Sequence, residues 1–337
     1  MKFTFLTLFS CLFFGGILYG QETPRSSQYI FNNFLLNPAL SGIDSYIDLK
    51  VGYRQQWSGL EGAPTTQYVS INTPIGDDYV RSSINSFSSN GYNPLSRSLV
   101  NSYTAAEPHH GFGLIAMNDK AGLLRQNSVS ATYAYHLGLS SSVNLSVGVA
   151  AGFHSLGLKV DDISAEHEQD PLFNADYNNR LRPDLGFGLW LYGPRFFVGA
   201  SAKQIIGSRT VIEEGSAVAY PYQSPSMYGT VGYKIFLDED IAMIPSMLAS
   251  YWKNAPAAID VNLKFAYQDR FWLAGSYRNN DAFSFLAGYN FGSLINVSYS
   301  YDVNTSALRR VNKGTHEIGI GFLLNNTYDV RCSTRQF

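Results

Sequence analysis

The six histidines are the side chains of this sequence best suited to acid–base chemistry at neutral pH. A serine hydrolase places a histidine between a nucleophilic serine and a carboxylate, and its serine often lies on a G-x-S-x-G turn. The sequence contains no such turn. A triad assembled from separate strands stays open, with His136, His154 and His316 as its histidines. Because hydrogen-bonded or solvent-facing histidines are far commoner, we assign no catalytic residue and expect no enzyme.

Metal binding has two candidates. His109 and His110 are neighbours, and neighbouring residues of a strand point to opposite faces, which is a poor geometry for holding one ion. An acidic run could bind calcium through carboxylates, but it lacks the regular D-x-D-x-D-G spacing; its members are Asp161, Asp162, Glu166, Glu168 and Asp170. We interpret this run as a solvated loop and expect neither a metal nor another cofactor.

These side chains must be positioned by strands. The clearest strand pattern in the sequence lies between residues 257 and 303. Apolar residues there alternate with small or polar ones, in runs of about ten residues separated by turns at Asp269-Arg270, Asn279-Asn280-Asp281 and Gly292-Ser293. In the last run the apolar parity holds Ile295, Val297, Tyr299, Tyr301 and Val303. Such strands also occur in a secreted β-sandwich. Their length, their Tyr and Phe content and their amide-rich polar faces favour a transmembrane barrel.

Further alternating segments extend this pattern over most of the chain. We expect strands at about 46–57, 67–75, 110–118, 128–137, 143–153, 184–192, 196–203, 227–236, 241–252 and 314–324. With the four strands between 257 and 303, the predicted fold is an all-β, antiparallel outer-membrane β-barrel of about 14 strands. Counting from a periplasmic N-terminus, the short connections fall in the periplasm and the long ones outside. The exception is 77–108, an insertion that this count places in the periplasm. Either it contains a further hairpin, or it meets a periplasmic component.

Composition and the N-terminus indicate an exported protein without spanning helices. Only 15% of the 337 residues are charged, against about 25% in an average soluble domain. No Lys/Arg cluster offers a phosphate footprint, so we expect no nucleic-acid partner. Lys2 and the apolar run after it predict a signal peptide at 1–20, and no later run could span a membrane as a helix. Cys11 lies in that signal, which leaves Cys332 without an internal disulfide partner.

The predicted organisation has four parts: the signal peptide, an N-terminal segment at 21–45 that packs in or on the barrel, the barrel at 46–324 and a tail at 325–337. The N-terminal segment is too short and mixed for a strand. Asn37-Pro38 turns it, and its apolar residues, including Tyr29 and Phe34, need burial in the mouth of the barrel or on a partner.

Several stretches resemble one known family. SQYIFNNFLLNPALSG and YRQQWSGLEGAPTTQYVSINTPIG near the N-terminus, then FWLAGSYRNNDAFSFLAGYNF and GTHEIGIGF near the C-terminus, resemble the PorP/SprF family of type IX secretion proteins of Bacteroidetes outer membranes. The resemblance covers nearly the whole mature chain, although the 77–108 insertion departs from it. In the last predicted strand His316 and Glu317 look like the family signature. From the strand pattern alone, one of the two faces the lipid and the other the lumen.

The resemblance implies a non-enzymatic outer-membrane barrel. It would assist the export or the cell-surface anchoring of a secreted protein such as a gliding adhesin, with outer-membrane lipid and periplasmic ring proteins as further partners. The candidate partner-binding residues are Tyr29, Asn32, Asn37, Pro38 and Trp57. Interfacial aromatic residues and a simple turn explain the same residues. The alternative function is a passive channel or a hydrophobic-solute transporter, and whether the lumen is open or filled by residues 21–42 distinguishes the two.

Overall fold

The computed structural model describes residues 26–76, 105–158, 180–206, 225–252, 255–268, 270–279 and 281–326. Its strands are β1 (Ile47–Gln55), β2 (Thr65–Ile75), β3 (His109–Ala121), β4 (Leu124–Ser140), β5 (Val143–Leu158), β6 (Arg180–Tyr192), β7 (Phe196–Lys203), β8 (Ser226–Tyr233), β9 (Ile235–Phe236), β10 (Ile241–Trp252), β11 (Ala255–Tyr267), β12 (Phe271–Arg278), β13 (Ala282–Phe291), β14 (Ile295–Asn304) and β15 (Thr315–Leu324). Four short 3-10 turns, η1, η2, η3 and η7, complete the described elements. None of the helices in these ranges is long and apolar enough to cross a membrane.

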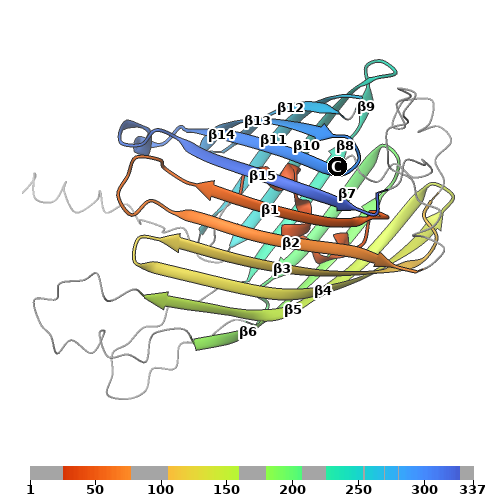
Figure 1. The fold of residues 1–337 in the computed structure, drawn as a ribbon, viewed down its shortest axis with the longest axis horizontal. Coiled ribbons are helices and arrows are strands. Elements are labelled where there is room, and N and C mark those ends of the chain that lie inside the picture. The colour runs from red at the N-terminus through yellow and green to blue at the C-terminus, as the bar shows by residue number, and fades with distance from the viewer. Residues whose placement is uncertain are drawn as a thin grey trace, which may run out of the picture.

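The strands form a closed antiparallel barrel (Figure 1). Apart from β8 and β9, strands that follow one another in the chain pair with each other, and β15 returns to pair with β1, which closes the ring. β8 and β9 both pair with β10 and are separated only by Lys234, so they are two halves of one stave. The described strands therefore make fourteen staves, which confirms the predicted fold and its even strand number.

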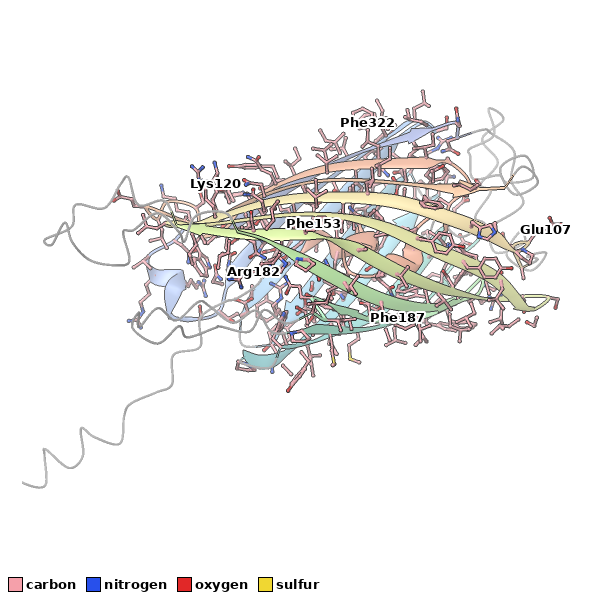
Figure 2. The ribbon with its side chains drawn as sticks, turned by 90° about the horizontal axis from the view of Figure 1, so that it is seen from below. Glu107, Lys120, Phe153, Arg182, Phe187 and Phe322 are labelled. Carbon is pink, nitrogen blue, oxygen red and sulfur yellow. The ribbon has the colours of Figure 1, made fainter. Side chains whose placement is uncertain are left out.

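The wall of the barrel has an apolar outer face and a polar inner face. Phe153, Phe187 and Phe322 lie on the outside of the wall (Figure 2), and the first of them exposes 57% of its surface. On β14 the inward residues are Asn296, Ser298, Ser300, Asp302 and Asn304, all buried. This alternation is the one that lipid outside and a polar interior require.

Aromatic clusters mark the two rims of the outer face. At the start of β3, the Nδ1 atom of His110 lies 2.7 Å from the Tyr133 hydroxyl. At the start of β15, at the opposite end, the Nδ1 atom of His316 lies 2.7 Å from the Tyr299 hydroxyl. Both clusters point outward, where membrane barrels carry aromatic girdles.

The two ends of the barrel differ in their connections. At one end, called the loop end, the β5–β6 and β7–β8 connections span 159–179 and 204–225. At the other, called the turn end, β4–β5, β6–β7 and β13–β14 are joined by 141–142, 193–195 and 292–294. Lys120 lies towards the loop end and Glu107 at the turn end (Figure 2). The β2–β3 connection, which contains the predicted insertion, leaves and returns at the turn end, and its residues 77–104 lie outside the described part.

Candidate functional site

The lumen of the barrel is filled by the first described residues of the chain. Residues 26–46, called the plug, contain η1 (Gln28–Ile30), η2 (Asn33–Leu35) and η3 (Pro38–Leu40). These turns lie inside the ring of strands (Figure 1), and most plug side chains are buried. Short 3-10 turns suit this sequence because Asn37-Pro38 cannot continue a helix across it.

Near the loop end, the plug joins a buried cluster of charges. The Arg54 guanidinium donates to Glu317 Oε2 at 2.8 Å and to Asp302 Oδ2 at 2.9 Å. The backbone N–H of Ser27 donates to Glu317 Oε2 at 3.1 Å, and its hydroxyl donates to Asp302 Oδ2 at 2.7 Å. Ser26 also donates its hydroxyl to Glu317. Two carboxylates thus share one guanidinium, and the plug serines supply the further donors that such a buried cluster needs.

Deeper in the lumen, η1 and η2 bond to several walls at once. Gln28 donates from Nε2 to the Glu317 carbonyl at 2.8 Å and accepts from the Ser298 hydroxyl at 2.7 Å. Asn262 donates to the Tyr29 hydroxyl. Asn32 donates to the Ser70 hydroxyl at 2.9 Å.

Asn37 fixes the start of η3 to the far wall. Its side-chain oxygen accepts from the N–H of Ala39 at 3.0 Å and so caps the turn. Its amide nitrogen donates to the carbonyls of Leu189 and Ala200 on β6 and β7, at 2.9 and 3.3 Å. Pro38 is buried at the first position of the turn, where the missing N–H has no cost.

Polar wall residues also bond to the carbonyls of the plug. Lys203 donates to Leu35 at 3.0 Å, Ser201 donates to Leu36 at 2.8 Å and Ser146 donates to Ala39 at 2.6 Å. The Nε2 atoms of His136 and His109 lie 2.8 and 3.1 Å from the carbonyls of Ser41 and Gly42. The two imidazole rings stack with centroids 4.4 Å apart. A 3-10 segment leaves many carbonyls unpaired, and these wall donors satisfy them.

Glycines in the wall let the plug backbone come close. A Cβ on Gly148 would lie 2.4 Å from the nitrogen of Ala39, and one on Gly111 would lie 1.9 Å from the carbonyl oxygen of Ser41. A Cβ on Gly188 would meet the Asn37 side-chain oxygen at 1.9 Å. Any other residue at these positions would collide with the plug. We call these three glycines on β3, β5 and β6 the plug-contact glycines.

Apolar contacts complete the packing of the plug on two sides. Phe34, Leu35, Ala39, Leu40 and Ile43 join a buried cluster with the wall residues Tyr68, Ile115, Trp190, Tyr192 and Phe197. Tyr29 and Ile30 join a second cluster with Leu248, Ala266, Trp272, Ala274 and Leu286. A cavity of about 100 Å³ remains between the plug and wall residues near the turn end, and two others hold about 20 Å³ each. A buried water needs a cavity of roughly 10–15 Å³ by this measure, so each of these three spaces has room for water.

Comparison with known proteins assigns the chain to a family. Residues 18–322 match the model of the family described as type IX secretion system membrane protein PorP/SprF. The chain belongs to the PorP/SprF family. This confirms the resemblance drawn from the sequence, and with the barrel fold it places the protein in the outer membrane. No curated protein matches it.

Solved outer-membrane proteins resemble this PorP/SprF protein at low sequence identity. The toluene transporter TbuX of Ralstonia pickettii has a TM-score of 0.49 and 11% identity, with 86% of this chain and 92% of that chain covered. The monoaromatic hydrocarbon channel CymD has a TM-score of 0.49 and 12% identity over 91% and 94%. Omp33 of Acinetobacter baumannii has a TM-score of 0.46 and 8% identity over 84% and 100%.

The structure places the predicted partner-binding residues of this PorP/SprF protein in two settings. Tyr29, Asn32, Asn37 and Pro38 lie in the plug, where they contact the barrel wall. Trp57 lies in the β1–β2 loop with φ +50°, and its backbone N–H donates to the Thr315 hydroxyl at 3.1 Å. Their binding of another protein stays a prediction.

The two signature residues of the family face opposite sides of β15. His316 points outward to its Tyr299 partner, and Glu317 points inward to Arg54 and the plug. The signature therefore combines a rim aromatic contact with the buried charge cluster. Sequence reasoning missed Arg54 and Asp302, because alternation marks them as inward residues but says nothing of what they meet. The signal that could have identified both residues is a charged side chain at an inward position near the end of a strand.

His136, one of the histidines that could have served in a triad, bonds to the plug instead. His136 Nε2 lies 3.5 Å from the Ser146 hydroxyl, but that hydroxyl donates to Ala39. The other nitrogen of His136 lies 3.3 Å from the Tyr192 hydroxyl, where a triad would have a carboxylate. Both residues are buried beneath the plug. His109 points inward and His110 outward, and the described residues contain no metal-binding cluster. The acidic run around Asp161 lies outside the described residues.

Proposed function

We propose that this PorP/SprF protein is a non-enzymatic outer-membrane component of the type IX secretion system that acts by binding partners. In this role it assists the export of a secreted protein, such as a gliding adhesin, or its anchoring at the cell surface. The observation that carries the proposal is the filled lumen. A barrel of fourteen staves has interior space, and here residues 26–46 occupy it with hydrogen bonds and apolar contacts. A barrel closed in this way is suited to docking rather than to solute passage.

The proposed absence of catalysis has support from the lumen chemistry. Buried His136 and Ser146 both bond to plug carbonyls, so neither has an orienting carboxylate nor access for a substrate. The charged residues of the Arg54 cluster are likewise occupied with one another. These interactions hold the plug, and they occupy the His136 and Ser146 pair that a triad would have used.

The ends of the barrel offer the surfaces for partners. The long connections 159–179 and 204–225 join strands at the loop end, where a secreted protein would meet the barrel. The 76–108 connection joins strands at the turn end, where periplasmic ring proteins would meet it. The apolar outer band meets the outer-membrane lipid.

Co-purification tests the proposed function. A copy tagged after residue 337 is purified from native membranes in mild detergent, and co-purifying proteins are identified by mass spectrometry. We expect a secreted surface protein, periplasmic ring proteins, or both. In the matched control, glycine-serine segments of equal length replace 159–179 and 204–225, and we expect this variant to lose the surface protein while keeping the barrel. Recovery of the wild-type barrel alone, with normal secretion in cells that lack it, contradicts the proposal.

Conductance tests the filled lumen directly. In a planar bilayer we expect no steady current from the wild-type barrel, because the plug fills the lumen with apolar contacts and hydrogen bonds to the wall. The comparison is a Gly148→Trp variant, in which the large side chain displaces η3 from β5. We expect this variant to conduct. Steady current through the wild-type barrel would instead favour a passive channel.

A further inference from the structure

The two ends of the plug lie at opposite ends of the barrel. Ser26 and Ser27 bond to Glu317 and Asp302, and these belong to the start of β15 and the end of β14, which meet at the loop end. At the other end of the plug, the Gly42 carbonyl lies 3.1 Å from His109, the first residue of β3, at the turn end. The chain therefore runs through the lumen from the loop end to the turn end.

The contacts between these ends follow the same direction. The Gln28 side chain bonds to Glu317 and Ser298, and Asn32 then bonds to Ser70 in the middle of β2. The Gly42 N–H bonds to Asn72, one inward position closer to the turn end on that strand. From Gly42 the chain has only four residues before it enters β1 at Ile47, which also lies at the turn end. The direction of the plug is thus fixed by its own bonds and by its covalent link to β1.

Loop lengths assign the two ends to the two sides of the membrane. Bacterial outer-membrane barrels have short turns in the periplasm and long loops outside the cell. The turn end carries the short connections 141–142, 193–195 and 292–294 and one long exception, 76–108, whereas the loop end carries 159–179 and 204–225. β15 ends at Leu324, at the turn end, as expected for a barrel with a periplasmic C-terminal end. The loop end therefore faces outside.

We infer that the chain enters its barrel from the cell surface, with Ser26 at the outer mouth. This differs from the periplasmic N-terminus with which the sequence-based count of connections began. It also goes beyond the proposed function, which would be the same with either end inside. An extracellular N-terminal end adds a second element, besides the long loops, that a surface partner can reach.

Cysteine labelling in intact cells tests this inference. In a Cys332→Ser background, single cysteines are introduced as Thr23→Cys ahead of the plug, Val311→Cys in the β14–β15 loop and Ser141→Cys in the β4–β5 turn. Val311 exposes 59% of its surface at the loop end, and Ser141 is exposed at the turn end. The reagent is a maleimide on a polyethylene glycol chain too large to pass porins, applied before and after the outer membrane is permeabilised.

We expect T23C and V311C to react in intact cells, and S141C to react only after permeabilisation. A T23C variant that stays unlabelled in intact cells overturns the inference, whatever happens after permeabilisation. Labelling of V311C only after permeabilisation overturns it as well, because the barrel would then be inverted. The outcome does not depend on which proteins co-purify, so this inference and the proposed function fail separately.

Discussion

Arg54 and Glu317 are directly opposite each other across the pair of strands that closes the barrel, and they form a buried ion pair of 2.8 Å. Arg54 belongs to β1, the first strand, and Glu317 to β15, the last. Asp302 on β14 shares the same guanidinium, and Ser27 of the plug bonds to both carboxylates. One charge cluster therefore joins three strands and the plug where the ring closes.

Removing the cation from this cluster should destabilise the barrel strongly. Arg54→Met would leave two carboxylates buried beside each other, and loss of one partner of a buried pair costs about 3–5 kcal/mol. The free energy of unfolding, from guanidinium titration in lipid vesicles, should fall by that amount. Arg309→Met, at an exposed loop position, is the control and should change it by less than ~0.5 kcal/mol. Equal effects of the two substitutions would contradict the structure.

The neighbouring signature residues should differ in their contributions. Glu317→Ala removes the acceptor of Arg54 and of two plug serines, and we expect a loss of about 3–5 kcal/mol. His316→Ala removes one rim contact with Tyr299, and we expect a loss of about 1 kcal/mol or less. The same titration measures both variants. A larger effect at His316 would show that the signature acts through the outer face.

Adding a methyl group to a plug-contact glycine should destabilise the packing of the plug. Gly148→Ala would put its Cβ into the backbone of Ala39, so the plug must shift, at a cost of about 1–3 kcal/mol. Gly275→Ala is the matched control, because a Cβ there has no heavy atom within 4 Å. Heat-dependent gel mobility compares their stability, and planar-bilayer recordings detect a loosened plug. If G148A and G275A behave alike, the close approach of η3 to β5 is wrong.

Replacing Asn37 with aspartate should destabilise the protein more than replacing it with alanine. Asn37→Ala leaves the Leu189 and Ala200 carbonyls without this donor and removes the cap of η3, at a cost of about 1–3 kcal/mol. Asn37→Asp keeps the cap acceptor but aims a buried charge at the same carbonyls, which costs more. Unfolding titrations of both variants at neutral pH measure the difference. An aspartate variant as stable as wild type would show that the donor role is absent.

Strand alternation predicted most of the barrel, because lipid and lumen impose opposite chemistry on successive residues. The strands at Phe196–Lys203 and Ile241–Trp252 have the predicted bounds. β4 and β5 extend further towards the loop end than predicted. The outward residues in the added part of β4, Arg125 and Asn127, are polar, so the apolar alternation ends before that strand does. Lys234, which divides one predicted strand into β8 and β9, is a buried inward residue that no periodicity singles out.

The candidate site was less predictable, since its contacts join residues far apart in the chain. The apolar residues of the N-terminal segment indicate a need for burial, but they carry no signal for direction. Ser27 and Asp302 are 275 positions apart, and only the closed ring brings them together. The sequence also does not show which wall glycines contact the plug, because small inward residues occur in barrels even where nothing approaches them.

The continuity of the plug with β1 has a consequence for biogenesis. The plug precedes the first strand, and the ring closes only when the last strand pairs with the first. Glu317, which bonds to Ser26 and Ser27, arrives with that last strand. A plug that lies against the growing wall before β15 docks is enclosed as the ring closes, whereas a late plug would have to thread a finished cylinder. The final step of barrel assembly thus also completes the charge cluster that secures the interior.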